Sequence, residues 1–276
     1  MLVVGILLRI CLTPIAFALV SKAQTRFGDW IGGRLIGLPL TTGPFLLTVC
    51  MTQSRSTAAH AAAGVTSGQI AVVGFCSAYA WMARRMRPLQ ATITSLGIAL
   101  AGVFALSLLA GTWSAATAVW VVILASLTLW PWAGHKPATT VTSDAPSTPT
   151  PMVQRALIST CVVATMSTLV PILGARPAGI ITSAPVLLSI ILPSTHRQNG
   201  AGGAAAVARG TIVSMVGTVA FSAVLATTLP HMSVGAALLL SAGVLCALIA
   251  ATPVLDRMLA QVNPAQLVQS RAPAHP

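Results

Sequence analysis

Two short segments place hydroxyl side chains just before a proline inside long apolar runs. They are Thr41, Thr42, Gly43 and Pro44 in the first half of the chain, and Thr182, Ser183, Ala184 and Pro185 in the second. Proline has no N–H and clashes with the carbonyl one turn earlier, so helices are predicted to break near Pro44 and Pro185. The hydroxyls can satisfy or redirect the freed backbone groups. Paired breaks of this kind predict a binding site for a small solute at the bilayer midplane. The alternative is a pair of proline kinks that serve packing alone.

Two isolated polar side chains in apolar runs join this candidate site. Arg9 lies about 11 Å into the first run, at 1.5 Å per residue. A charge at that depth is costly and indicates a functional role, with an anion or a substrate carboxylate as its partner. The alternative is that Arg9 snorkels to the outer interface. Gln69 could line a polar path together with Tyr79.

The apolar runs that position these residues are long enough to span a bilayer. The chain of 276 residues is 55% hydrophobic and 7% charged and contains no Glu, and its mean hydropathy is +0.88. A soluble domain needs several times more charge. Backbone groups in lipid must be satisfied within a segment, which predicts helices, and the alternation of a membrane barrel is not seen. At about 20 apolar residues per span, we predict an all-α bundle of about nine spans, at 2–20, 35–52, 57–82, 90–110, 114–133, 154–174, 177–194, 203–229 and 232–252.

Basic residues predict the orientation of this bundle. If successive loops alternate between the two sides, Arg55 and Arg176 lie on one side and twelve basic residues lie on the other. This bias places the richer side in the cytoplasm. We therefore expect an inner (plasma) membrane protein with its N-terminus outside and its C-terminus in the cytoplasm. The twelve are Lys22, Arg26, Arg34, Arg84, Arg85, Arg87, Lys136, Arg155, Arg197, Arg209, Arg257 and Arg271.

Weak internal similarity relates the two halves of the chain. Three pairs of segments match in the same order and with nearly the same separation along the sequence: 41–44 with 182–185, 61–68 with 203–210, and 101–106 with 242–248. Because such a separation covers five spans, an odd number, the second copy enters the membrane from the opposite side. This predicts an inverted repeat, an architecture of secondary transporters. Chance similarity among small-residue helices is the alternative, and the fifth span has no counterpart in the chain.

Composition divides the chain into four parts. Residues 1–133 form the first half of the bundle, and residues 153–258 form the second half. Between them, residues 134–152 are rich in Pro, Thr and Ser, which is typical of a flexible linker. We expect residues 259–276 to be a disordered cytoplasmic tail.

The sequence argues against several kinds of chemistry. The three acidic residues, Asp29, Asp144 and Asp256, lie outside the predicted spans, so no catalytic constellation can be proposed and we expect no enzyme activity. No metal-ligand spacing and no nucleotide-binding glycine loop occurs, which predicts no metal and no cofactor. The basic residues form no nucleic-acid-binding domain. The expected partners are the lipid bilayer and a small-molecule substrate, and the GxxxG pair Gly64 and Gly68 leaves a homodimer open beside close packing within one chain.

These observations favour a secondary transporter or permease for a small molecule, with its site where the second and seventh spans break. The alternative is a membrane subunit or scaffold that transports nothing.

Overall fold

The structure is a computed structural model, and it describes residues 22, 26, 29–39, 42–108, 115–133, 172 and 174–262. The described residues form helices joined by turns, with no strand among them. Arg9, Thr41, the span predicted at 2–20 and the linker at 134–152 lie outside them, as does nearly all of the span predicted at 154–174. The helices are α2 (Asp29–Ile36), α3 (Thr42–Thr52), α4 (Arg55–Met82), α5 (Pro88–Leu108), α6 (Ala115–Ala133), α8 (Ala175–Thr182), α9 (Val186–Thr228) and α10 (Val234–Val262).

Several helices have the length and apolar surface of membrane spans. Four segments of the described residues qualify by length and composition: Arg55–Met82, Pro88–Ala105, Ala175–Thr228 and Val234–Thr252. Large apolar side chains are exposed on α5 and α10, including Ile93, Phe104 and Leu239, whereas polar side chains such as Gln69 and Thr211 are buried. An apolar exterior around buried polar groups is compatible with a multi-pass membrane protein. The total of about nine spans stays a prediction.

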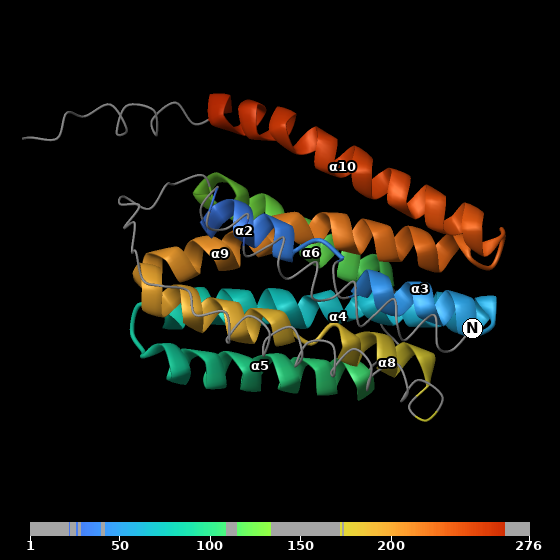
Figure 1. Cartoon of the computed structure of the whole chain (residues 1–276), viewed down its shortest axis with the longest axis horizontal. Coiled ribbons are helices and arrows are strands. Elements are labelled where there is room, and N and C mark those ends of the chain that lie inside the picture. The colour runs from blue at the N-terminus through green and yellow to red at the C-terminus, as the bar shows by residue number, and fades with distance from the viewer. Residues whose placement is uncertain are drawn as a thin grey trace, which may run out of the picture.

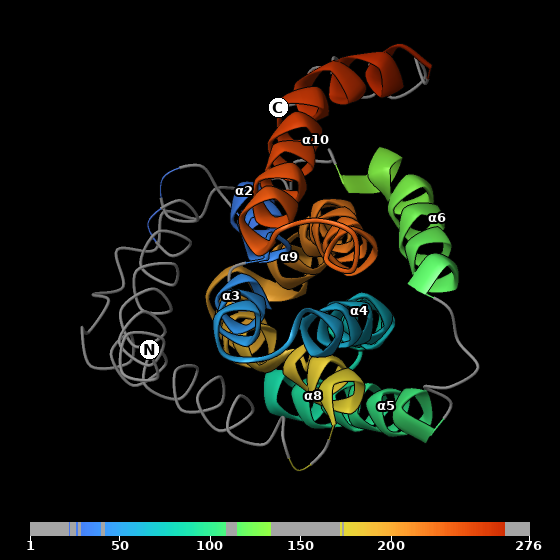
Figure 2. The same cartoon turned by 90° about the vertical axis from the view of Figure 1, so that its right-hand side faces the viewer.

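The core of the bundle is formed by α4 and the second part of α9. The helix α9 turns sharply at Gly200, which has a φ of 70°, so it consists of residues 186–199 and residues 201–228. A positive φ of this kind is readily adopted by glycine. The second part of α9 packs antiparallel to α4, while α2, α8 and α6 pack against this pair (Figure 1). Viewed along the bundle, α5, α6 and α10 lie at its periphery (Figure 2).

Helices in the first half of the chain begin and end a constant number of residues before corresponding helices in the second half. We call this alignment of the two halves the helix register. It aligns α2 with α8 at both ends, so that Asp29 corresponds to Ala175 and Ile36 to Thr182. The same register aligns both ends of α4 with those of the second part of α9, and the start of α5 with the start of α10. The two members of each pair run in opposite directions in Figure 1. The alignment of 41–44 with 182–185, inferred from short matches, is therefore wrong for these helices.

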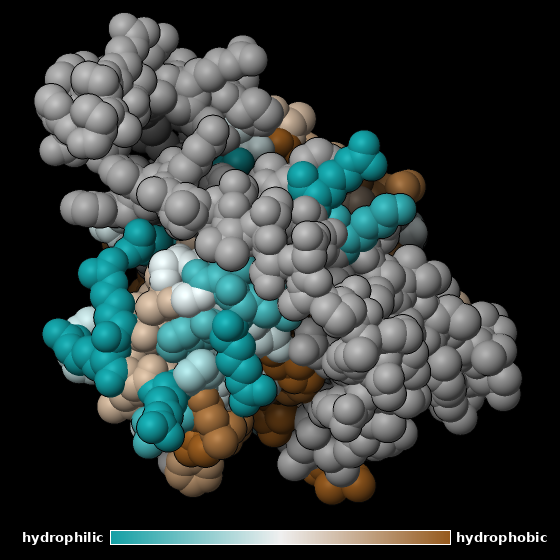
Figure 3. Space-filling view, turned by 60° about the vertical axis from the view of Figure 1, so that its left-hand side comes forward, coloured by the Kyte–Doolittle hydropathy of each residue, from teal (hydrophilic) through white to brown (hydrophobic). Residues whose placement is uncertain are grey.

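Basic side chains lie at both ends of the bundle, in unequal numbers. Arg84, Arg85 and Arg87 follow the end of α4, and Arg197 lies near the same end, since the neighbouring His196 contacts Tyr79. The hydrophilic side chains gathered there are visible in Figure 3. Arg55 begins α4 and Arg176 lies in the first turn of α8, at the opposite end. These six arginines are thus divided between the two ends as the alternating loops predict.

The helix α10 extends further than the sequence suggests. It ends at Val262, beyond the limit at residue 258 predicted for the second half. The remaining residues of the predicted tail lie outside those described.

Glycines let the short helices α2 and α8 approach the long ones closely. A Cβ added at Gly33 of α2 would collide with the carbonyl oxygen of Val207, and one added at Gly179 of α8 would collide with that of Ala61. In the helix register, Gly33 corresponds to Gly179 and Ala61 to Val207. The contact of α2 with α9 and the contact of α8 with α4 are therefore made by corresponding residues. Small residues that permit such contacts are a common basis of helix packing in membranes.

We predict that Gly64→Ala destabilises the bundle by about 1–3 kcal/mol, because its Cβ would meet the backbone carbonyl of Arg176. The matched control is Gly74→Ala in the same helix, where no atom lies within 4 Å of the added Cβ. Thermal unfolding of the two purified variants in detergent should give a clearly lower Tm for Gly64→Ala alone. Equal Tm values would contradict the close packing of α4 on α8.

Candidate functional site

Two helices are interrupted at half the height of the bundle. The first interruption separates α2, which ends at Ile36, from α3, which begins at Thr42. The second separates α8, which ends at Thr182, from α9, which begins at Val186. Pro185 therefore lies within a break, where it was predicted.

The position predicted for the first break is wrong. Pro44 is the third residue of α3, and a proline in the first turn of a helix is tolerated because the N–H that it lacks would have no partner there. The proline within the break is Pro39, which corresponds to Pro185 in the helix register and whose carbonyl accepts the N–H of Gly43. The described part of the break, Gly37 to Pro39, thus precedes Thr42, Gly43 and Pro44, which belong to α3.

A cavity of about 60 Å³ lies between the two breaks. Of the predicted site residues, the structure brings six to its wall: Thr42, Gln69, Thr182, Ser183, Ala184 and Pro185. Gly43 and Pro44 do not line it, and Arg9 and Thr41 lie outside the described residues. The wall also contains residues that were not predicted, notably Gly37, Leu38, Thr211, Met215 and Thr218. That these residues bind a solute remains a prediction.

Hydroxyls from one half of the chain satisfy backbone carbonyls in the other half. Thr218 of α9 donates its hydroxyl hydrogen to the carbonyl of Gly37 in the first break, with an oxygen–oxygen distance of 2.6 Å. Ser183 in the second break donates to the carbonyl of Val65 in α4 at 3.2 Å and accepts from Nε2 of Gln69 at 3.3 Å. These bonds fix each interruption against the long helix of the opposite half.

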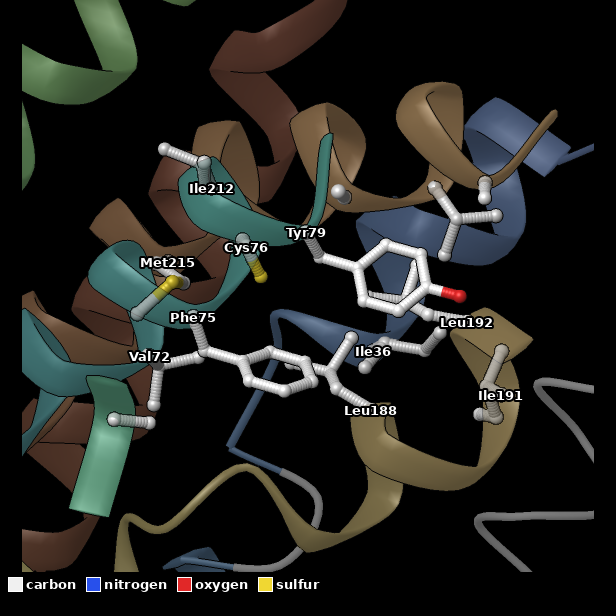
Figure 4. Close-up of a cluster of buried hydrophobic side chains, with 14 of the residues drawn as sticks. Ile36, Val72, Phe75, Cys76, Tyr79, Leu188, Ile191, Leu192, Ile212 and Met215 are labelled. Atoms are coloured by element: carbon white, nitrogen blue, oxygen red, sulfur yellow. The ribbon is translucent and has the colours of Figure 1, made fainter. Parts of the chain in front are cut away.

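The cavity lies between two apolar clusters. Along α4, residues between Ala58 and Val65 belong to one cluster. Gln69 and Val72 follow and line the cavity. Phe75 and Tyr79 then belong to the second cluster. Figure 4 shows this second cluster, where Ile36, Val72, Leu188 and Met215 also line the cavity. Gln69 is near the middle of the 28 residues of α4. The described residues thus line a small cavity at half height with both polar and apolar side chains, and packed apolar side chains lie on both sides of it.

The two clusters contain residues that correspond in the helix register. Phe75 and Tyr79 of one cluster correspond to Phe221 and Leu225 of the other. The remaining corresponding pairs, each with one member in each cluster, are Phe45 with Ile191, Leu46 with Leu192, Ala58 with Ala204, Ala61 with Val207, Ala62 with Ala208, Ala83 with Leu229, and Ala91 with Ala237.

The side chains described at this site suit non-covalent binding. In the described part of the chain, no three His, Cys, Asp or Glu side chains gather where they could hold a metal ion. The side chains of the wall offer hydroxyl and amide groups and apolar contacts, which can bind and orient a small solute. Comparison of the chain with protein-family models, with curated proteins and with solved structures finds no match.

We predict that Thr218→Val destabilises the protein by about 1 kcal/mol, because it removes the hydrogen bond to Gly37 without changing the size of the side chain. Thr227→Val is the matched control, since Thr227 is exposed on the same helix and bonds only carbonyls of its own helix. Denaturant unfolding of both variants in mixed micelles measures the difference. Equal stabilities would show that the bond to the break contributes nothing.

Proposed function

We propose that the chain is a small secondary transporter or permease, in which two inverted halves alternate access to a solute in the central cavity. The observation that carries the proposal is the meeting of two broken helices at half the height of an apolar bundle, around a cavity whose wall contains hydroxyl and amide groups. Irregular backbone at membrane depth is tolerated only inside protein or beside a polar cavity. Matched broken helices at a repeat interface are typical of the binding sites of secondary transporters.

An inverted repeat accounts for the recurring helix bounds. Helices that correspond in the helix register run in opposite directions (Figure 1), as a two-fold axis in the membrane plane requires. An axis along the membrane normal would make them parallel. The exchanged glycine contacts and the corresponding apolar clusters support the same relation.

Alternating access follows from the position of the clusters. Each cluster separates the cavity from one end of the bundle, so the cavity opens to one side when one cluster parts and the other stays packed. Because the clusters consist of corresponding residues, the two open forms bury similar apolar surfaces. The free-energy difference between them is then small enough for a bound solute to shift.

The surroundings proposed for this transporter follow from its charges. We place it in the inner (plasma) membrane, with the N-terminus outside and the C-terminus in the cytoplasm, because basic residues are concentrated on one side. Its partners are the bilayer and a small solute, and a homodimer through small-residue helix faces is a further proposal. It binds no nucleic acid and catalyses no reaction of its own.

The second candidate function is a membrane subunit or scaffold that transports nothing. The close contacts at Gly33, Gly64 and Gly179 favour it, since they would also serve a purely structural bundle. A polar cavity is not needed for such a role. Removal of the cavity's polar groups therefore distinguishes the two functions, because it should impair a transporter but not a scaffold.

The proposal is tested by uptake into liposomes containing the purified chain, with a panel of radiolabelled small ions and solutes. We expect saturable uptake of at least one of them. The double variant Thr42→Val with Gln69→Leu should reduce that uptake at least about tenfold, since each side chain is 5% exposed and lines the cavity. Thr227→Val, outside the cavity, should leave uptake unchanged. If no solute enters, or if the double variant transports as well as the control, the scaffold function is favoured.

Orientation is tested separately. Reporter domains inserted in the linker at 134–152 and after Val262, where α10 ends, should both report the cytoplasm, because the alternating loops put most basic residues on that side. Enzymatic reporters active on only one side of the membrane provide the measurement. A signal from the outer side at either position would overturn the predicted number of spans.

A further inference from the structure

Backbone groups of both kinds, donors and acceptors, are left without partners in the wall of the central cavity. Among the described residues, no acceptor takes the N–H of Thr42 in α3 or those of Leu187 and Leu188 in the first turn of α9. No described donor reaches the carbonyl oxygens of three other residues of the wall, which are Leu38, Thr182 and Ser183. The two breaks therefore offer a solute unpaired acceptors as well as unpaired donors.

The side chain of Gln69 adds an acceptor whose orientation is fixed by its neighbours. Its Nε2 donates to the carbonyl of Val65 at 3.4 Å and to the hydroxyl oxygen of Ser183 at 3.3 Å. Because Ser183 gives its own hydroxyl hydrogen to backbone carbonyls, both neighbours can only accept, and the amide must turn its nitrogen toward them. Gln69 is 5% exposed and lines the cavity, and no described group donates to its Oε1. This oxygen is therefore available to accept a hydrogen bond from a solute.

The side chain of Thr42 adds a hydroxyl that can donate. Thr42 is 5% exposed and lines the cavity, and no group of the described residues accepts its hydroxyl hydrogen. By contrast, the hydroxyls of Thr182, Ser183 and Thr218 already donate to backbone carbonyls. Neither the Thr42 hydroxyl nor the Gln69 amide oxygen is sealed off by the surrounding protein, so a solute in the cavity can reach both. Buried polar groups that lack a partner are expected where a ligand completes the hydrogen bonds.

The wall of the central cavity favours a solute without charge. None of the described residues that line it is charged, whereas Arg176 and His60 line a separate cavity at the end of the bundle where α4 and α8 begin. An ion that leaves water for a site without an opposite charge pays a large desolvation cost. An anion would also face the unpaired carbonyls, and a cation would face the unpaired N–H groups. An uncharged solute that both donates and accepts hydrogen bonds avoids these costs.

The remainder of the wall is apolar, and it includes Ile36, Val72, Leu188 and Met215 (Figure 4). Such side chains suit the apolar part of a solute, while a few polar groups fix its orientation. A carboxamide meets both polar requirements in one group, since its oxygen accepts and its nitrogen has two hydrogens to donate. We infer that the solute is an uncharged carboxamide with an apolar part, which accepts from the Thr42 hydroxyl and donates to the amide oxygen of Gln69. This inference rests on the proposed transport function and names the class of its substrate.

The test uses the purified full chain and probes that match in heavy atoms but differ in charge. They are the unbranched primary amides from acetamide to pentanamide, with the carboxylates and alkylammonium ions of the same numbers of heavy atoms. At constant ionic strength, at least one amide should raise the Tm in a saturable manner, and its matched ions should not. The methyl ester with as many heavy atoms accepts hydrogen bonds but donates none, so it should bind at least about fivefold more weakly than the amide. Protein-dependent uptake of the amide into liposomes should saturate over the same concentration range.

Two variants at one position separate binding from folding. Thr42→Val should weaken the apparent affinity for the amide about fivefold, the effect of losing one hydrogen bond between uncharged groups. Thr42→Ser keeps the hydroxyl and should bind the amide more tightly than Thr42→Val, while the Tm values without any probe show that both variants fold.

Three results would overturn the carboxamide assignment and leave transport standing: uptake of an ion or another solute without a response to any amide, equal affinity for the amide and its matched ester or ions, or equal amide affinity in Thr42→Val and Thr42→Ser. The absence of uptake for every solute tested would remove the transport function together with the carboxamide assignment.

Discussion

A backbone that leaves its helical path inside an apolar bundle must find partners for its N–H and C=O groups, because lipid offers none. This requirement shapes the whole centre of the protein. The breaks after Ile36 and Thr182 lie against α9 and α4, where Thr218 and Val65 supply a donor and an acceptor. Both breaks would be costly at the lipid surface. Their burial accounts for the position of the short helices α2 and α8 against the long ones.

Close packing is the condition for these hydrogen bonds. The contacts at Gly33 and Gly179 leave no room for a Cβ between the backbones. Because the backbones are so near, a short side chain such as Ser183 can reach a carbonyl on the neighbouring helix at 3.2 Å. A larger residue at either glycine would move the helix and lengthen these bonds. The glycines and the hydroxyls of the breaks thus act together.

Sequence patterns predicted part of this arrangement. The length of the apolar runs predicted helices. The positions of Thr42, Gln69 and Ser183 inside such runs predicted that these polar side chains lie deep in the bundle. The first break was misplaced because a proline in the first turn of a helix disturbs nothing, so Pro44 resembles Pro185 in sequence but not in structure. Thr218 gave no local signal, since a threonine in a helix can bond its own preceding turn. Only tertiary packing brings it to Gly37.

The helix register shows why short sequence matches mislead. Segments rich in Ala, Gly and Val resemble one another at many separations, so a match that pairs Pro44 with Pro185 was as easy to find as one that pairs Pro39 with Pro185. In the helix register the glycine contacts and apolar clusters correspond as well. The polar residues of the cavity, however, have apolar counterparts: Thr42 corresponds to Leu188, Gln69 to Met215, and Thr218 to Val72. The helices around the cavity thus correspond in their bounds, while the hydrogen-bonding side chains of its wall have no polar counterparts at these positions.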